Sequence, residues 1–340
     1  MTRLFAWSRK FLLLMMSGFA FRAVTTDAAL INGRNYVPLT SWAYENGFMC
    51  YQSQGGDRVV ATNRTTRLAF AADARDAGIN GVEVALCYPP ANVKGTLLIS
   101  QLDLDATVRP LVFPQKFPAK RITTICLDPG HGGKDTGNHV GWHYEKVYTL
   151  ALAATVRDEL KSAGFNVIMT RTKDASVGLA DRPALANRLG ADLFVSLHFN
   201  ATPTGKNEVE GPQTYCITPV GASSTDAQGE GSNYGPTPAN RVEQRSLLLA
   251  YDVQRSLVRT LGAEDRGVRR ARFAVLRDAT MPAILVEGGY MTHPIEGRKI
   301  FSDAYRRQMA QAIVTGILAY QKYTAPAVRP SPPATLHSAP

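Results

Sequence analysis

Residues 126–133, Cys-Leu-Asp-Pro-Gly-His-Gly-Gly, decide how the chain can fold. They complete an apolar run, residues 122–127, whose β-branched and aliphatic side chains predict a buried strand. A Pro-Gly break ends the strand, and His131 is the first residue beyond the break that can bind a metal. Glycines on both sides of His131 permit a sharp turn and leave the imidazole open to a ligand. Because α/β proteins place ligands at such strand ends, we expect the chemistry near His131.

The chain beyond residue 121 alternates apolar strands with amphipathic helices, the pattern of a layered α/β domain. We expect helices at residues 144–163, 182–189, 247–261 and 303–320. Further strands are expected at residues 165–170, 192–198, 273–276 and 283–286, the last of them ending at Glu287. Residues 219–240 are rich in Gly, Ser, Thr, Asn and Pro and are expected to form a mobile loop. The sequence thus predicts an α/β domain over residues 122–323.

The preceding part, residues 29–113, is expected to be a small strand-rich α+β module. Asn-Gly turns at residues 32–33 and 80–81 each precede a short strand. The module contains no histidine, so it lacks the commonest metal ligand. Three prolines between residues 109 and 120 mark the connection, and we place the linker at residues 114–121. Within the module, a helix is expected at residues 39–46 and strands at residues 58–63 and 67–70.

The two ends of the sequence are expected to lie outside the folded domains. Residues 1–28 resemble a signal peptide, since basic residues precede a short apolar core at residues 11–21 and small residues follow it. The alternative is an uncleaved membrane anchor, which would be the protein's one contact with a membrane. Residues 324–340 are rich in Pro, Ala and Ser and are expected to be a disordered tail.

Composition and charge narrow the class of partner. A hydrophobic content of 45% with 19% charged residues is typical of a globular protein. The formal net charge is +10, and loss of a leader ending after Arg22 would lower it to +6. A mildly basic exported protein suits an anionic polymer such as the cell wall. Nucleic acid would also accept the charge, but export argues against it. The periplasm is the expected compartment, with secretion to the cell wall as the alternative.

The four cysteines are Cys50, Cys87, Cys126 and Cys216, and none lies in a C-x-x-C pair. This spacing argues against a thiolate zinc site. An oxidising compartment would permit a bridge within each half of the chain, from Cys50 to Cys87 and from Cys126 to Cys216. The alternative is that they are small buried side chains at strand positions.

Four ionisable residues lie at the ends of elements in the predicted α/β domain. His131 follows the first strand, Glu145 opens the next helix, and His198 and Glu287 end later strands. Parallel or mixed sheets gather strand ends along one edge, so these residues can converge. Two imidazoles, one carboxylate and a water are the ligand set of a catalytic zinc site. This set leaves a second carboxylate as general base, and Glu287 is the candidate because two glycines after it leave it reachable.

Each of these residues also has an ordinary structural interpretation. A histidine at a strand end commonly makes hydrogen bonds only, Glu145 suits the first turn of any helix, and Glu287 suits a buried ion pair. His139 and His143, just before Glu145, are competing metal ligands. No H-E-x-x-H helix is present, which disfavours the common metalloprotease class. The residues alone therefore predict a metal-dependent hydrolase and leave its ligands open.

The order of the sequence blocks resembles that of a known enzyme family. Similar blocks, in the same order, occur in the zinc-dependent N-acetylmuramoyl-L-alanine amidases of the Amidase_3 type: LDPGHGGKDTG, EKVYTLALA, MTRTKD, ADRPALANRLGADLFVSLHFNA and DRGVRRARFAVLRDATMPAILVEGGYMTHP. The resemblance runs over residues 122–320. It implies a mixed central sheet flanked by helices. It also implies hydrolysis of the amide that joins the lactyl group of muramic acid to L-alanine in peptidoglycan.

The same resemblance implies roles for the site residues. It assigns a Zn²⁺ ion to His131, Glu145 and His198 and makes Glu287 the catalytic acid/base. Peptidoglycan is then the partner, while the sequence identifies no protein activator. Two alternatives remain, an inactive amidase-like wall-binding protein and another zinc peptidase or deacetylase of the cell wall. All four positions are intact, which favours an active enzyme.

Two further features of the sequence carry expectations of their own. Through the phrases YVPL and LLISQLDL, residues 29–113 resemble the small N-terminal domain first described in copper amine oxidases, which implies a binding or spacer role and no copper site. Five arginines are expected either to line a groove for anionic stem peptides or to form a solvated surface: Arg266, Arg269, Arg270, Arg272 and Arg277. Framework or groove positions are expected for Arg171, Arg182 and Asn200.

Overall fold

The computed structural model of the 340-residue chain describes residues 28–117, 121–202, 208–225 and 235–324. The predicted signal peptide and tail lie outside these residues, apart from their inner boundary positions. The middle of the predicted loop at residues 219–240 and part of the predicted linker also lie outside them.

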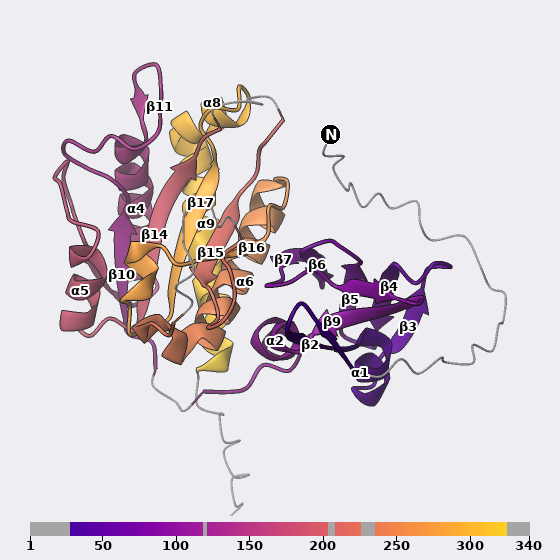
Figure 1. Cartoon of the computed structure of the whole chain (residues 1–340). Coiled ribbons are helices and arrows are strands. Elements are labelled where there is room, and N and C mark those ends of the chain that lie inside the picture. Colours follow the sequence, from indigo (N-terminus) through magenta and orange to yellow (C-terminus); the bar gives the residue numbers. More distant parts are fainter. Residues whose placement is uncertain (1–27, 118–120, 203–207, 226–234, 325–340) are drawn as a thin grey trace, which may run out of the picture.

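The C-terminal part of the chain is built on a mixed sheet (Figure 1). Its six strands, in spatial order, are β13 (Asn166–Met169), β10 (Thr124–Pro129), β14 (Leu193–Asn200), β17 (Ala283–Tyr290), β15 (Gln213–Ile217) and β16 (Val268–Ala271). The first four run parallel, β15 is antiparallel to β17, and β16 is parallel to β15. The predicted mixed sheet is therefore confirmed.

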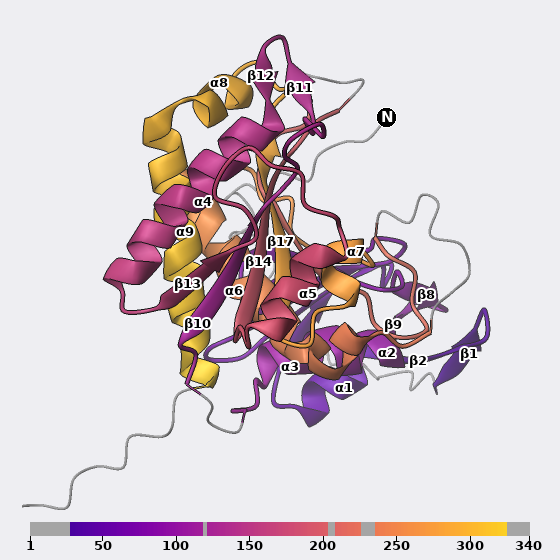
Figure 2. The same ribbon diagram turned by 90° about the vertical axis from the view of Figure 1, so that its left-hand side faces the viewer.

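Helices cover both faces of this sheet (Figure 2). One layer contains α4 (Glu145–Ser162), α6 (Glu243–Leu261) and α9 (Asp303–Tyr320), and α8 (Glu296–Phe301) packs at its end. The opposite face carries the short helices α5 (Asp181–Arg188) and α7 (Ala274–Arg277). Alternation along β10 explains the two layers, because Ile125 and Leu127 join the larger core while Cys126 between them joins the smaller one.

The N-terminal part contains a small antiparallel sheet, a five-stranded meander and several short helical segments. An antiparallel sheet contains β1 (Ala29–Ile31), β2 (Arg34–Pro38), β9 (Thr96–Ser100) and β8 (Ala91–Val93), with α1 (Leu39–Glu45) after β2. A meander contains β3 (Met49–Gln52), β4 (Arg58–Thr62), β5 (Arg67–Ala71), β6 (Asp76–Ile79) and β7 (Val82–Ala85). Short helical turns follow: α2 (Gln101–Asp103), a π-helical turn (Leu104–Val108) and α3 (Arg109–Val112).

The meander continues directly into the C-terminal sheet. Strand β7 pairs in parallel with β16 through Val84 and Val268, which gives one sheet of eleven strands among the described residues. Side chains reinforce this seam: the Tyr251 hydroxyl donates to Ile79 O at 3.0 Å, and the Glu83 amide donates to Asp265 Oδ2 at 2.8 Å. The N-terminal module is thus held against the α/β domain by sheet pairing and hydrogen bonds.

The structure differs from the sequence prediction at two places in the α/β domain. Residues 273–276 were expected to be a strand, but β16 lies at Val268–Ala271 and helix α7 follows it. Glu287 was expected to end its strand, but β17 continues to Tyr290. The glycine after Glu287 is needed for packing, because a Cβ at Gly288 would overlap Met309 and Phe199.

All four cysteines are free thiols, so neither proposed bridge is present. Cys87, Cys126 and Cys216 are buried and Cys50 is partly buried, as expected for small apolar side chains. Among the described residues, the helices are each too short or too polar to cross a lipid bilayer.

Candidate active site

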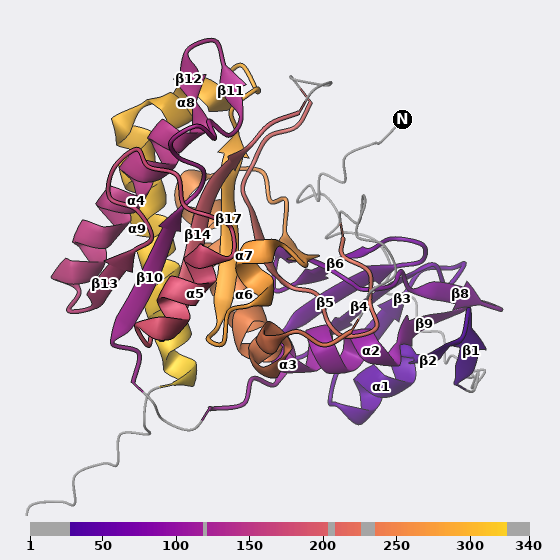
Figure 3. The ribbon, with the colours of Figure 1, turned by 60° about the vertical axis from the view of Figure 1, so that its left-hand side comes forward.

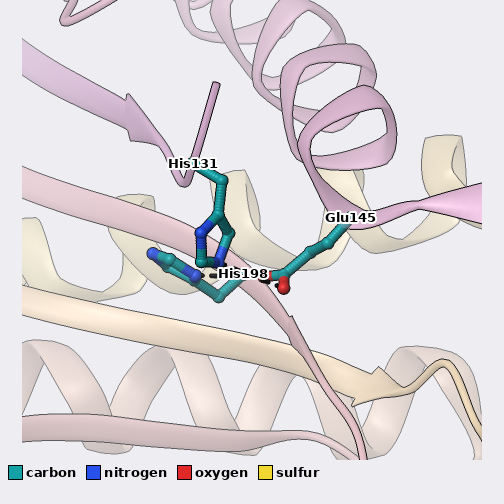
Figure 4. A group of neighbouring side chains, drawn as sticks. All are labelled: His131, Glu145 and His198. Carbon is teal, nitrogen blue, oxygen red and sulfur yellow. Dashed lines mark hydrogen bonds and ion pairs between the residues drawn. The ribbon is translucent and has the colours of Figure 1, made fainter. Parts of the chain in front are cut away.

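Three of the predicted site residues gather where β10 and β14 end and α4 begins (Figure 4). His131 lies in the turn after β10, Glu145 is the first residue of α4, and His198 lies near the end of β14. One donor atom from each of the three lies within 4.8 Å of the others. Glu287 stands directly beside His198, because the two residues are paired in the register of β14 and β17.

The turn that carries His131 is tight and depends on its glycines. His131 itself has a φ of 58°, and Gly132 and Gly133 follow at 128° and 62°. Such angles are uncommon for any residue except glycine. A Cβ at Gly130 would overlap the ring of His198, and one at Gly137 would overlap His131 and Glu145. The glycines therefore serve the close approach of the three side chains as well as the turn.

Glu145 is a buried carboxylate whose two oxygens are both bound. Its Oε2 lies 3.1 Å from His131 Nε2, and its Oε1 lies 3.0 Å from His198 Nδ1. The backbone amides of Asn138 and Phe199 donate to the same carboxylate at 2.9 and 3.0 Å. Burial alone would raise the pKa of Glu145, but its hydrogen bonds to the two histidines hold the pKa well below its usual range. The side chain is therefore more than an ordinary first-turn acid.

His131 has a second acidic neighbour, which the sequence reasoning missed. Its Nδ1 lies 2.8 Å from Asp135 Oδ2, and backbone hydrogen bonds between Gly132 and Asp135 close the turn that makes this contact possible. Burial alone would lower the pKa of His131, but Glu145 and Asp135 raise it to about 9. The signal in the sequence was an aspartate four residues after the histidine, within a glycine-rich turn.

The donor set fits a divalent metal such as zinc. Two imidazoles and one carboxylate are ligands that zinc prefers, and catalytic zinc sites keep a further position open. The His131–Asp135 contact supplies the carboxylate that orients many metal-binding histidines. Since metal binding requires neutral imidazoles, and the pKa values of His131 and His198 are both raised, metal affinity is expected to increase with pH.

Glu287 differs from Glu145 because one of its carboxylate oxygens has no hydrogen-bond partner among the described residues. Its Oε2 is buried and makes no hydrogen bond to the residues that the structure describes. Burial raises the pKa of Glu287 to about 7, against the opposing effect of the neighbouring His198. A carboxyl group with this pKa can both accept and donate a proton near neutral pH, which is the requirement for a general acid/base.

Arg171 and Arg182 are framework residues beneath the site. Arg171 donates from Nη2 to the carbonyls of Gly130 and Lys146 at 2.9 and 2.8 Å. Arg182 forms a buried ion pair with Asp128 at 2.8 Å and also binds the carbonyl of His131. Both guanidinium groups therefore hold the backbone of the His131 turn, and Arg171 also holds the start of α4.

The remaining histidines of the described residues lie outside the donor cluster. His143 stacks on Phe301, with ring centroids 3.9 Å apart, and His139 lies near the ring of Tyr144. His293 is buried and accepts a hydrogen bond from the amide of Glu296 at 3.1 Å. His139 and His143 are thus not brought together with His131, and the structure does not support them as competing ligands.

The arginine run after residue 265 is mostly engaged within the protein. Arg270 is 1% exposed and binds carbonyls of two different elements, while Arg272 donates to Pro219 O and Ala222 O. Arg269 forms an ion pair with Asp76 of the N-terminal module at 2.7 Å. Arg269, Arg270 and Arg272 therefore neither line an open groove nor form a solvated surface. Arg277, by contrast, is exposed.

Comparison with known proteins identifies the domain that carries this site. The family model of the N-acetylmuramoyl-L-alanine amidases, Amidase_3, matches residues 125–319. The uncharacterized protein YqiI of Bacillus subtilis is 35% identical over 58% of this chain and 84% of its own length. The N-acetylmuramoyl-L-alanine amidase AmiA of Salmonella typhimurium is 33% identical over 61% of this chain and 78% of its own.

A solved structure agrees with these sequence matches. The N-acetylmuramoyl-L-alanine amidase of Clostridium difficile 630 superposes with a TM-score of 0.50 at 34% identity, over 60% of this chain and 98% of that one. The family match begins at β10 and ends in α9, so it contains all four candidate residues and excludes the N-terminal module. The chain therefore belongs to the Amidase_3 family of N-acetylmuramoyl-L-alanine amidases.

Proposed function

We propose that this chain is an exported, zinc-dependent amidase that cleaves the bond between the lactyl group of muramic acid and L-alanine in peptidoglycan. Its biological role would be in cell-wall turnover or cell separation. The observation that carries the proposal is the pairing of a His-Glu-His donor cluster with Glu287, whose buried Oε2 has no hydrogen-bond partner among the described residues. Family membership supplies the bond to be cleaved.

His131, Glu145 and His198 would hold the zinc ion. Zinc at this position would polarise the scissile carbonyl and lower the pKa of a water. The chain itself positions the three donors: Asp135 orients His131, two backbone amides orient Glu145, and Glu145 in turn contacts His198. This preorganisation limits the conformational entropy that the side chains lose on binding the metal.

Glu287 would move the proton. Its carboxylate would accept a proton from the attacking water and then donate it to the nitrogen of the leaving L-alanine. The raised pKa of about 7 supports both halves of this role, because neither protonation state is strongly disfavoured near neutral pH. Its place beside His198 in the strand register puts it next to the donor cluster.

The proposal also includes the cellular compartment of the protein and the role of its N-terminal module. The sequence of residues 1–28 supports export, to the periplasm or to the outside of the cell wall. The module at residues 29–113 would act as a binding or spacer element related to the N-terminal domain of copper amine oxidases. Its seam with β16 supports a fixed rather than a loosely tethered module.

Digestion of purified sacculi by the zinc-loaded chain tests the proposed function. Mass spectrometry should detect intact stem peptides that begin with L-alanine, and glycan strands that carry a free lactyl carboxylate. A chelator should stop the release and added zinc should restore it. Release of acetate would indicate a deacetylase, and peptides lacking L-alanine would indicate a peptidase. No release at stoichiometric zinc would indicate an inactive wall-binding protein; each of these three results contradicts the proposal.

A further inference from the structure

The side chain of Trp142 is unusually exposed to solvent for a large apolar residue. Its side chain is 89% exposed, the largest value among the large hydrophobic residues that the structure describes. Tryptophan is on average highly buried, and a ring left in water forgoes the free energy of burying its apolar faces. Trp42, by contrast, is 4% exposed in the N-terminal core. An indole presented in this way is available to bind a ligand.

Trp142 lies in the turn of a short hairpin next to the candidate active site. The hairpin consists of β11 (His139–Val140) and β12 (His143–Tyr144), and Glu145 follows it immediately. The base of the hairpin is hydrogen-bonded to the donor cluster, because Asn138 N donates to the Glu145 carboxylate and Glu145 N donates to Asn138 O. Figure 3 shows the hairpin projecting beyond the ends of β10 and β14.

The hairpin is anchored on one side, which fixes its tip. The ring of His143 stacks on Phe301 of α8 at an interplanar angle of 5°, and its Nδ1 is hydrogen-bonded to the Tyr148 hydroxyl. Val140 packs against the larger hydrophobic core. These contacts restrain the backbone that carries Trp142, so less backbone entropy is lost when the indole binds a ligand.

Charge indicates which part of a peptidoglycan substrate the tip would contact. Residues 139–144 contain no lysine or arginine, so the hairpin offers no permanently charged cation to the carboxylates of a stem peptide. Lys146, the next cation, is bound to Asp174 at 2.7 Å and to Gly133 O at 2.8 Å. The faces of a pyranose ring carry C–H groups, which pack on the apolar faces of an indole. The tip therefore suits a sugar better than an anionic peptide or an anionic lipid surface.

We propose that Trp142 is a substrate-binding residue that stacks on a sugar of the glycan strand flanking the muramoyl unit being cleaved. This inference rests on the proposed function, since it assumes peptidoglycan as substrate. The muramoyl unit must reach the donor cluster, whereas the exposed indole at the tip of the hairpin is available to the neighbouring part of the strand. Trp142 thus favours long glycan strands over isolated muramoyl peptides.

Steady-state kinetics on two substrates test this role. Trp142→Ala should raise KM on long glycan strands about tenfold, while its KM on a single muramoyl tripeptide changes less than about twofold. Trp142→Phe should recover KM on strands to within about threefold of the wild type, because phenylalanine keeps a flat apolar face. The matched control is Leu318→Ala, an exposed apolar residue on α9, which should leave both KM values unchanged.

The outcomes separate this inference from the proposed function. Equal KM values for wild type and Trp142→Ala on long strands would overturn the inference. Loss of zinc from Trp142→Ala, with equal losses of activity on both substrates, would indicate a structural role and would also overturn the inference. Weaker binding of Trp142→Ala to anionic vesicles without a change in KM would indicate a membrane contact and would overturn it as well. Failure of the wild type to cleave either substrate would instead overturn the proposed function.

Discussion

Ionisable side chains are buried, wholly or in part, at two places along the large sheet, and their hydrogen-bond partners differ. At the seam with the N-terminal module, Arg270 donates to Ala106 O at 2.9 Å, to Thr107 Oγ1 at 3.2 Å and to Ile217 O at 3.2 Å. At the ends of β14 and β17, Glu287 has a buried oxygen with no partner among the described residues. A buried ion surrounded by acceptors joins two parts of the fold. A buried ion without such partners keeps a perturbed pKa and is a candidate for chemistry.

The same contrast, between a charged group with hydrogen-bond partners and one without, occurs around the donor cluster itself. Glu145 and Glu287 flank His198, yet the first accepts four hydrogen bonds or ion pairs and the second has no partner for Oε2 within the described part of the chain. Their pKa values consequently move in opposite directions. Environment alone thus separates a carboxylate suited to holding a metal from one suited to moving a proton.

The largest effect is expected from removing the paired carboxylate. Glu145→Ala should weaken zinc binding by more than about a hundredfold and abolish stem-peptide release, because it removes a metal ligand. The change should be measured by competition with a zinc chelator, with circular dichroism to verify folding. Zinc affinity within a few-fold of the wild type would remove Glu145 from the ligand set.

A substitution at the seam with the N-terminal module should change the stability of the fold and leave zinc affinity unchanged. Arg270→Met should lower the free energy of unfolding by about 2–4 kcal/mol, because several buried acceptors lose their donor. Urea unfolding measures this effect. Arg188→Met, at an exposed position of α5, is the control and should stay within about 0.5 kcal/mol. A zinc affinity changed by Arg270→Met would show that the two regions are coupled.

Glu287 should make the stability of the metal-free protein depend on pH. Its pKa is raised from 4.5 to about 7, so the folded state binds the proton more tightly than the unfolded state. The resulting stability is complete below about pH 4.5 and is lost as the pH rises to about 7, a change of at most about 3 kcal/mol. The difference between wild type and Glu287→Gln should follow this curve, and a pH-independent difference would contradict the raised pKa.

A smaller effect is expected at Asp135, which contacts the metal only through His131. Asp135→Asn should weaken zinc binding by about 10–100-fold, since the imidazole loses the carboxylate that orients it and increases its basicity. Isothermal titration with zinc measures the change. An affinity equal to that of the wild type would show that the turn alone orients His131.

Much of the fold could be predicted because local signals agreed with the final packing. The helix at residues 303–320 has the predicted bounds, since its apolar spacing matches the face that packs on α4 and α6. The strand before His131 was recognised because both faces of β10 are buried, which produces a continuous apolar run. His131, Glu145 and His198 converge because β10 and β14 are neighbours and α4 follows β10.

The errors arose where tertiary contacts decided the structure. Arg269 and Arg270 lie on a strand because β16 pairs with β15 and β7, and no local pattern revealed that second partner. The glycines after Glu287 were interpreted as a strand end, although a Cβ at Gly289 would overlap the buried Glu296. Asp135 was missed because its contact with His131 depends on the geometry of the turn.

The rate of stem-peptide release by zinc-loaded Glu287→Gln tests the central claim most directly. The variant keeps the size of the side chain and leaves all three donors in place, so it should bind one zinc as the wild type does. We expect release from sacculi to fall by about 10²–10⁴-fold, because the group that transfers the proton is gone. Release at the wild-type rate with full zinc occupancy would show that Glu287 is not the acid/base.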